Sequence, residues 1–336
     1  MKTIPRYWAF APTQEGFLLW RSSPDSEAAA RDLARQAADR VSRFEQGDIV
    51  EAEKYPYGVT LREKLLGEID DVRGQLQGFI TRNTNGSEVL NVKNVMFLDW
   101  DTPETRKTTF FPDFFRRLFR QIFSKESHYA IAELSDWPSE PTPGFWRERY
   151  PWTADIPELK AFMPKVDRMP DWGVRVYKTC AGYRGLVTHA TFDPTADATL
   201  DLMRQFRCDP QYVALCKRQE SFRARLTPKG WRCKLWGKQL PSSFKFRYPY
   251  SGHGSDLVWK TSDEAAETQR VQAALAKYDV IYDNAVAAYE QATVGYATCR
   301  YLGTVGNGNI HPDIASIVAL HDESTHALAE TEMILA

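Results

Sequence analysis

The chain has 336 residues, 43% of them hydrophobic and 26% charged, and its formal net charge is −1. This composition is typical of a soluble globular protein with a large core. A net charge so close to zero excludes an overall basic field for nucleic acid, so any phosphate binding must come from a local basic patch.

In chain order, the first hundred residues predict a hairpin, two helices and a set of strands. Residues 74–83 and 88–101 are rich in Val, Ile and Phe and read as strands, with a hairpin turn through Asn85-Gly86 between them. Ser26 or Asp25 can cap the first helix. The remaining expected bounds are 6–11 and 16–20 for the hairpin, and 23–47 and 61–69 for the helices.

The rest of the chain predicts helices around one pair of strands. Residues 172–179 and 182–193 form that pair, joined by a small turn. Residues 136–173 are dense in Pro and Trp and predict a long ordered insertion without helix or strand. The expected helices span 110–123, 198–206, 262–294 and about 312–333.

These elements predict an α+β fold with a mixed or antiparallel sheet core, flanking helices and a helical C-terminal appendage. We divide the chain into an N-terminal α/β unit (1–75), a core (76–260) with the insertion 136–173, and a helical C-terminal region (261–336). The C-terminal helices are a candidate surface for a protein partner.

The sequence "VMFLDWD" runs a hydrophobic strand into Asp99 and Asp101. Residues i and i+2 of a strand share a face, so the two carboxylates are expected side by side, with Trp100 on the opposite face. Their repulsion should raise one pKa unless a cation such as Mg²⁺ or Mn²⁺ lies between them. The alternative is a solvated strand end. Arg82 ends the preceding strand, is expected to face the same site, and is a candidate nucleic-acid contact.

The strand pair in "YKTCAGYRGLVTH" encloses a turn that could hold an anion through Thr179 and the backbone around Gly182. Arg184 follows on the second strand, and its guanidinium suits phosphate. His189 lies on the opposite face by strand alternation and is not expected to contact Arg184. The alternative is an ordinary hairpin with a surface arginine.

Residues 208–231 interleave basic and aromatic side chains, which is the local patch that nucleic-acid binding would need. Arg223, Arg225 and Lys229 are the candidate contacts to a nucleic-acid backbone. Asp209, inside this segment, is a candidate third metal ligand or a counter-charge. The alternative is a solvated basic segment whose arginines pair with acids elsewhere.

The remaining features of the sequence concern the cellular compartment, membrane association and two histidines. The five cysteines are odd in number and form no CxxC pair, so we expect reduced thiols in a cytoplasmic protein. No apolar run approaches the length of a membrane span, and the N-terminus does not read as a signal peptide, so no membrane partner is expected. His321 and His326 are five residues apart, off the helical metal spacing, and are expected at the surface.

The order of these motifs resembles the archaeo-eukaryotic primase or primase-polymerase superfamily over roughly residues 79–232. The sequence "MFLDWD" is similar to its first motif, "TCAGYR" to its second through Thr179 and Gly182, and Asp209 is a candidate for its third. Arg184 stands where the family has a nucleotide-binding histidine.

The resemblance implies an RRM-like primase-polymerase core and a nucleotidyltransferase that acts on a nucleotide triphosphate and single-stranded or primed nucleic acid. It implies divalent metal, Mg²⁺ or Mn²⁺, on Asp99 and Asp101, with Asp209 as a further catalytic acid. Thr179, Gly182 and Arg184 would hold the triphosphate.

Other functions stay open. A non-catalytic nucleic-acid-binding or assembly protein could keep the same fold. "FLDWD" also resembles the first motif of haloacid-dehalogenase-like phosphatases, although Pro103 stands where that family has Thr or Val. A further nucleotidyltransferase fold places Gly-Ser before its Asp-x-Asp, as Gly86-Ser87 would, but needs a helix between them.

Overall fold

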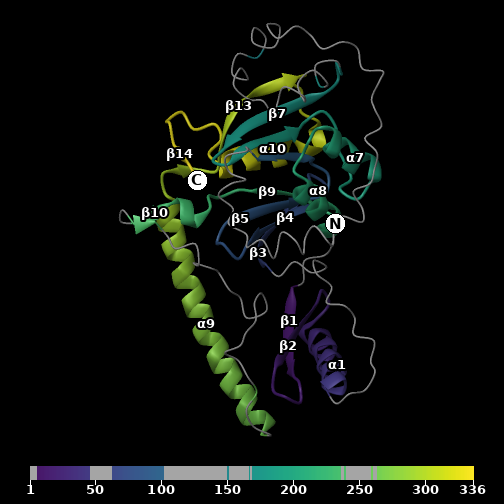
Figure 1. The fold of residues 1–336 in the computed structure, drawn as a ribbon, viewed down its shortest axis with the longest axis vertical. Helices are drawn as coiled ribbons and strands as arrows, with labels where there is room; N and C mark the ends of the chain where they lie inside the picture. The colour runs from purple at the N-terminus through teal and green to yellow at the C-terminus, as the bar shows by residue number, and fades with distance from the viewer. Residues whose placement is uncertain are drawn as a thin grey trace.

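The chain folds into an α+β structure whose main sheets are antiparallel, as the sequence predicts (Figure 1). The computed structural model describes residues 6–45, 63–101, 150, 166, 169–235, 238–239, 259 and 263–336. Five α-helices lie within these ranges. None of the helices described there is long and apolar enough to cross a lipid bilayer. The predicted helix 110–123 and nearly all of the insertion 136–173 lie outside the described residues.

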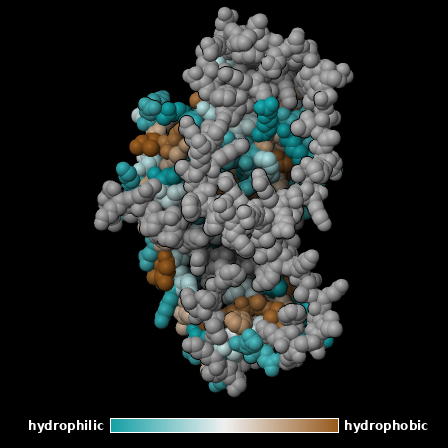
Figure 2. Space-filling model, viewed as in Figure 1, coloured by the Kyte–Doolittle hydropathy of each residue, from teal (hydrophilic) through white to brown (hydrophobic). Residues whose placement is uncertain are grey.

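The N-terminal residues form the expected hairpin and helix, which lie at one end of the molecule (Figure 1). Strands β1 (Tyr7–Pro12) and β2 (Leu18–Ser23) pair antiparallel. They pack against α1 (Glu27–Glu45), whose first turn is capped by the Ser26 hydroxyl, 3.1 Å from the Ala29 amide. Figure 2 shows hydrophobic residues at the surface of this end, and the exposed ones include Tyr7, Phe17 and Leu33.

The first four-stranded sheet has the order β3-β4-β5-β9, and each neighbouring pair is antiparallel. Its strands are β3 (Lys64–Asp70), β4 (Leu76–Arg82), β5 (Glu88–Val92) and β9 (Phe222–Arg225). The predicted helix over 61–69 is wrong, because most of that segment is β3. Pairing with β4 outweighs a local helix preference that Gly67 already weakens.

The second four-stranded sheet has the order β13-β7-β8-β6, again antiparallel throughout. Its strands are β6 (Phe97–Asp101), β7 (Gly173–Thr179), β8 (Gly182–Val187) and β13 (Cys299–Gly306). The segment 88–101, expected as strand throughout, bends at 93–94, so that β5 and β6 enter different sheets. Strands also fill the interval after Gly86-Ser87, where the Gly-Ser type of nucleotidyltransferase needs a helix.

Among the described helices of the second half, those predicted over 198–206 and 262–294 are confirmed, the one expected at about 312–333 is shorter, and the helix over 210–219 was not predicted. These helices are α7 (Asp197–Gln205), α8 (Pro210–Gln219), α9 (Glu264–Thr293) and α10 (Ala315–Ser324). Short elements complete the set: η2 (Gly230–Arg232), β10 (Lys234–Leu235), β11 (Lys238–Gln239), β12 (Tyr296–Ala297), η3 (Pro312–Ile314) and β14 (Ile334–Leu335).

The C-terminal region is not the helical appendage that the sequence suggests. Strand β13 is the edge of the second sheet, and α10 buries Ile317 and Val318 in the main core. The N-terminal boundary at residue 75 also divides the β3–β4 hairpin. Both errors have one cause, which is that local sequence patterns do not show which strands pair. The partner of β13 is the distant β7, and the partner of β3 lies across the proposed boundary.

One hydrophobic core joins both four-stranded sheets with α7, α8 and α10. Leu90 and Phe222 enter it from the first sheet, Phe97 and Val176 from the second, and Met203 from α7. All five side chains are almost fully buried. Because the sheets share this core, the ends of β6 and β9 are held in a fixed relation to each other.

Candidate active site

The three sequence motifs converge at the end of β6. In the β6–β8 register, Asp99 lies opposite Arg184 and Asp101 opposite Gly182. From the α7–α8 connection, the Asp209 amide donates a hydrogen bond to the Asp99 carbonyl at 2.8 Å. Segments more than a hundred residues apart in the chain therefore meet at one pair of carboxylates.

The two faces of β6 differ as strand alternation predicts. Trp100 is 3% exposed and packs into the core, where its indole Nε1–H donates to the Phe206 carbonyl at 2.8 Å. Asp99 and Asp101 lie on the other face and are both partly exposed. The indole hydrogen bond anchors the end of β6 to the core. The two carboxylates lie on the opposite face of β6, which is also the face of Arg184.

The charge of Asp99 is costly in this position. Burial is the main cause that raises the pKa of Asp99 above its usual range, and the neighbouring Asp101 and Asp209 raise it further. Arg184 and Arg225 act in the opposite direction. The direction of this shift agrees with the predicted repulsion between the paired aspartates, although desolvation contributes more to it than repulsion does.

Arg184 lies between the two sheets and not at the surface. It is 7% exposed, and its Nη1–H donates to the Arg225 carbonyl at 3.0 Å. The same Nη1 lies 3.0 Å from Nε2 of His321, a residue of α10. His321 is fully buried, so its predicted surface position is wrong. His189 is separate from Arg184, as expected, and its ring packs on Trp172 at 4.1 Å.

The turn between β7 and β8 lies beside Asp101, because Gly182 pairs with Asp101 in the β6–β8 register. The Thr179 hydroxyl accepts from the Ala181 amide at 3.4 Å. Gly182 permits a close approach of two strands, because a Cβ atom there would lie 1.9 Å from the Trp100 carbonyl oxygen. Glycine is therefore required at this position by packing against β6, independently of any anion held by the turn.

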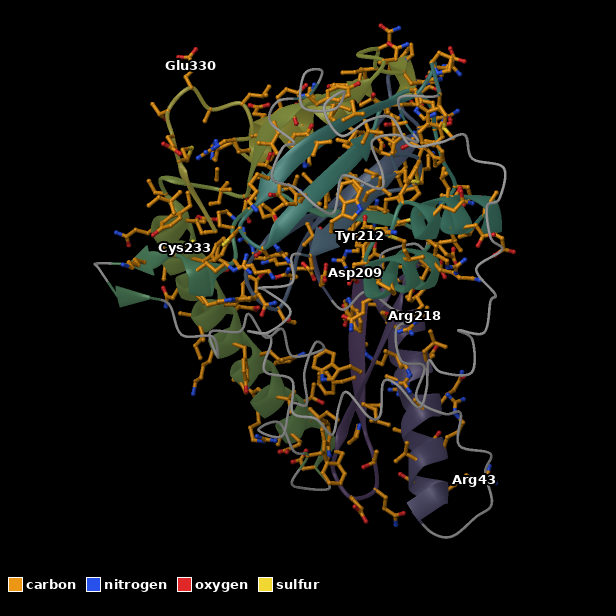
Figure 3. All side chains as sticks on the ribbon, turned by 45° about the horizontal axis from the view of Figure 1, so that its top comes forward. Arg43, Asp209, Tyr212, Arg218, Cys233 and Glu330 are labelled. Carbon is orange, nitrogen blue, oxygen red and sulfur yellow. The ribbon has the colours of Figure 1, made fainter. Side chains whose placement is uncertain are left out.

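Asp209 is the N-cap of α8. Its Oδ1 accepts from the amides of Gln211 and Tyr212 at 2.8 and 2.9 Å, and Figure 3 shows Asp209 and Tyr212 together at the start of the helix. Among the residues that the structure describes, no three His, Cys, Asp or Glu side chains form a group that could hold a metal ion. Asp209 thus acts as a helix cap and a nearby negative charge.

Asp99 and Asp101 alone still fit one kind of metal site. Mg²⁺ is commonly held by one or two carboxylates, with water and substrate phosphates as its remaining ligands. The unfavourable charge of Asp99 is the condition that a bound cation would relieve. The donor set therefore suits a divalent metal that is completed by substrate and not a preformed protein cage.

Two of the predicted nucleic-acid contacts are engaged inside the protein. Arg82 is 6% exposed and donates to the Gly86 carbonyl at 2.9 Å and to Glu88 at 3.0 Å. Arg223 forms an ion pair with Glu63, with an Nη2 to Oε2 distance of 2.6 Å. These guanidinium groups connect secondary-structure elements, and several of their N–H donors are used within the protein.

We expect Arg223→Gln to lower the free energy of unfolding by about 1–3 kcal/mol, since it leaves the half-buried Glu63 carboxylate without its partner. The pairing energy can be isolated by a double-mutant cycle with Glu63→Gln in urea. Nucleic-acid binding at low salt should be unchanged. Weakened binding without loss of stability would restore Arg223 as a contact.

The remaining basic side chains surround the carboxylates. We call Arg184, Arg225, Lys229 and Arg232 the cation cluster. Burial is the main cause that lowers the pKa of Arg225 to about 10 and that of Lys229 to about 7, and neighbouring cations add to both shifts. In addition, the buried Nε of Arg225 has no hydrogen-bond partner in the described part of the chain. Excess positive charge with an unused donor favours an anion ligand.

The low pKa of Lys229 predicts a pH dependence. The folded state releases the lysine proton near pH 7, whereas the unfolded chain keeps it to about pH 10.4, so the free energy of unfolding should rise with pH across that window. Lys229→Met should remove this rise, and Lys277→Met, at an exposed position of α9, should not. Urea unfolding at pH 6, 7.5 and 9 tests it. An equal rise in both variants would contradict the shift.

The sequence did not assign a role to Arg232, Cys208 or His321. Arg232 is visible in the basic segment, but nothing local places it beside the aspartates. Cys208 accepts from the Asp99 amide at 3.2 Å through its Sγ, a contact that no spacing predicts. A signal does exist for His321: it lies four residues after the core residue Ile317, on the apolar face of α10.

The site therefore joins two carboxylates suited to a divalent metal with four cations suited to a polyphosphate. No protein-family model matches the chain, and neither a curated protein nor a solved structure gives a significant match. The resemblance to the primase-polymerase superfamily therefore stays a prediction from the sequence motifs alone.

Proposed function

We propose that the chain is a divergent primase-polymerase-like nucleotidyltransferase that uses Mg²⁺ or Mn²⁺ on Asp99 and Asp101 to act on nucleotides and nucleic acid. One observation carries the proposal: three motifs named from the sequence meet in space, with Asp99 opposite Arg184 and bonded through its carbonyl to Asp209. Chance resemblance at a single short motif would not require the other two to lie beside it.

The chain's own residues would perform positioning and charge stabilisation, which are the main requirements of phosphoryl transfer. Asp99 and Asp101 would hold the metal, which when bound neutralises phosphate charge and orients the attacking hydroxyl. Arg184 and Arg225 would stabilise negative charge on the phosphates. Lys229 would do the same, which is supported by the interaction of Asp101 and Asp99 with it: both raise its pKa.

The second motif would contribute to phosphate binding mainly through the position of its backbone, and less through the side chain of Thr179. The Thr179–Gly182 turn ends directly beside Asp101 and so bounds the site on one side. Backbone amides of such turns bind anions without a charged side chain. A triphosphate held between this turn and the cation cluster would lie next to the metal-binding carboxylates.

The proposal is tested with the wild-type protein. Labelled ribo- and deoxynucleotide triphosphates are offered with Mn²⁺ or Mg²⁺ on primed and unprimed single-stranded DNA and RNA. We expect metal-dependent incorporation that EDTA abolishes. If no combination gives incorporation, nucleotidyl transfer is excluded. Nucleic-acid binding that persists without any turnover would then identify a binding or assembly protein on this fold.

The phosphatase alternative receives less support from the site. Its chemistry needs a second acidic pair near the first, and the described carboxylates that act on Asp99 are Asp101 and the single Asp209. Arg184 and Arg225 lower the pKa of Asp99 and are the cations that act on it most strongly. Release of phosphate from a simple aryl phosphate, lost with Asp99→Asn, would reverse this preference.

A further inference from the structure

A buried chain of hydrogen bonds leads from α10 to Arg184. His321 Nε2 lies 3.0 Å from Arg184 Nη1, and His321 Nδ1 lies 3.1 Å from Asp322 Oδ1. The three residues are between 0% and 7% exposed. Neither His321 nor Asp322 belongs to the motifs that define the site. They extend the hydrogen-bonded chain from Arg184 into the protein interior.

The partners fix the state of the imidazole. An arginine guanidinium only donates hydrogen bonds, so Nε2 of His321 must accept from Arg184. The ring proton then lies on Nδ1, where it donates to the Asp322 carboxylate. Burial lowers the pKa of His321 to about 4, which keeps the ring neutral near pH 7. Contacts with the rings of Tyr177 and Phe97, at 4.8 and 5.5 Å, hold its plane.

Asp322 is in turn anchored from β7. Its Oδ2 accepts from Arg175 Nη2 at 2.5 Å, and its Oδ1 also accepts from the Tyr177 hydroxyl at 2.7 Å. Arg175 stacks over the Tyr301 ring of β13, with 4.2 Å to the centroid. The carboxylate thus has donors on both oxygens and cannot rotate without breaking several charged hydrogen bonds.

We infer that His321 and Asp322 are positioning residues that hold Arg184 opposite Asp99 through one fixed imidazole tautomer, and that this orientation sets the affinity of the site for polyphosphate. The inference deepens the proposed function, on which it rests only for the identity of the natural ligand. Arg184 is held at Nη1 by the Arg225 carbonyl and His321, so its orientation depends on both.

The tautomer can be observed directly. Long-range ¹H–¹⁵N NMR of the wild-type protein should show His321 with its proton on Nδ1 and an unprotonated Nε2 from pH 6 to pH 8. His326, which is exposed, serves as the internal reference. Assignment follows from loss of the signal in His321→Gln. A proton on Nε2 of His321 would overturn the inference.

Two substitutions of His321 separate the hydrogen bonds. Glutamine can place an acceptor near the position of Nε2, whereas asparagine can place a donor near Nδ1 but does not reach Arg184. Isothermal titration with inorganic tripolyphosphate should therefore give near-wild-type affinity for His321→Gln and about tenfold weaker binding for His321→Asn, as expected for one charged hydrogen bond. Equal affinities in the two variants would show that the contact with Arg184 does not matter.

Asp322→Asn tests the far end of the chain. The amide oxygen should face Arg175, which turns its NH₂ group toward His321 Nδ1 and forces the ring proton to Nε2, against Arg184. We expect the changed tautomer by NMR and about tenfold weaker tripolyphosphate binding. Glu323→Gln and His326→Asn, at exposed neighbouring positions, are the matched controls and should bind as wild type. Weak binding without a tautomer change would contradict the mechanism.

Failure of this inference is distinguishable from failure of the proposed function. If the wild type incorporates no nucleotide but the tautomer and the tripolyphosphate affinities behave as described, the positioning role stands and the transferase assignment fails. If incorporation is found, the variants that weaken tripolyphosphate should raise KM for the nucleotide about tenfold and change kcat less. Unchanged KM values in an active enzyme would reject the positioning role alone.

Discussion

The double variant Asp99→Asn with Asp101→Asn is expected to incorporate no labelled nucleotide above background while remaining folded. Asparagine keeps the shape of each side chain but removes the negative charge that would bind divalent metal. The cation cluster alone would then have to stabilise the transferring phosphate, without a metal to orient the attacking hydroxyl. We expect a loss of at least about a thousandfold in rate, the scale reported for removal of a principal electrostatic group.

Stability should move in the opposite direction, which separates lost function from lost folding. Because the folded pKa of Asp99 is raised, its ionisation costs stability once the pH exceeds the ordinary range of an aspartate. The double variant should therefore unfold at equal or higher urea concentration than the wild type at pH 7. Asp70→Asn, at the end of β3, is the control and should leave activity unchanged. An active double variant would refute the metal site.

The parts of the site that sequence predicts are those fixed by local geometry. Strand alternation is sufficient to place Asp99 and Asp101 on one face and Trp100 on the other, and the structure confirms it. The short turn around Gly182 is similarly local. The convergence of the three motifs is not a local property. Only the family resemblance could suggest it, because the spacing of residues along the sequence does not show which strands become neighbours.

The errors concern partners that are distant in the chain. His321 lies 137 residues from Arg184, and Glu63 lies 160 residues from Arg223. A basic segment therefore looks free in sequence when part of it is already paired. The segment that becomes β3 shows the same limit for secondary structure, since its helix-forming residues are overridden by pairing with β4.

Gly182→Ala is expected to disrupt the site by displacing the backbone of β6 and β8. The added methyl group would lie 1.9 Å from the Trp100 carbonyl oxygen and 3.1 Å from the Asp101 Cα, and both atoms belong to the backbone of β6. The clash therefore cannot be relieved by a side-chain rotation, and β8 must move away from β6 or lose pairing there. We expect the free energy of unfolding to fall by about 3 kcal/mol, at the upper end for overpacking.

The effect on activity should exceed the effect on the folded fraction, because the displaced strands carry Asp101 and Arg184. At a temperature where the variant is more than 90% folded by circular dichroism, nucleotide incorporation and tripolyphosphate binding should both remain at least about tenfold below wild type, since misplacement by about 1 Å costs that much or more. Gly67→Ala in β3 is the matched control, since a Cβ atom there meets nothing within 4 Å. Full activity in folded Gly182→Ala would show that the β6–β8 register does not position the site.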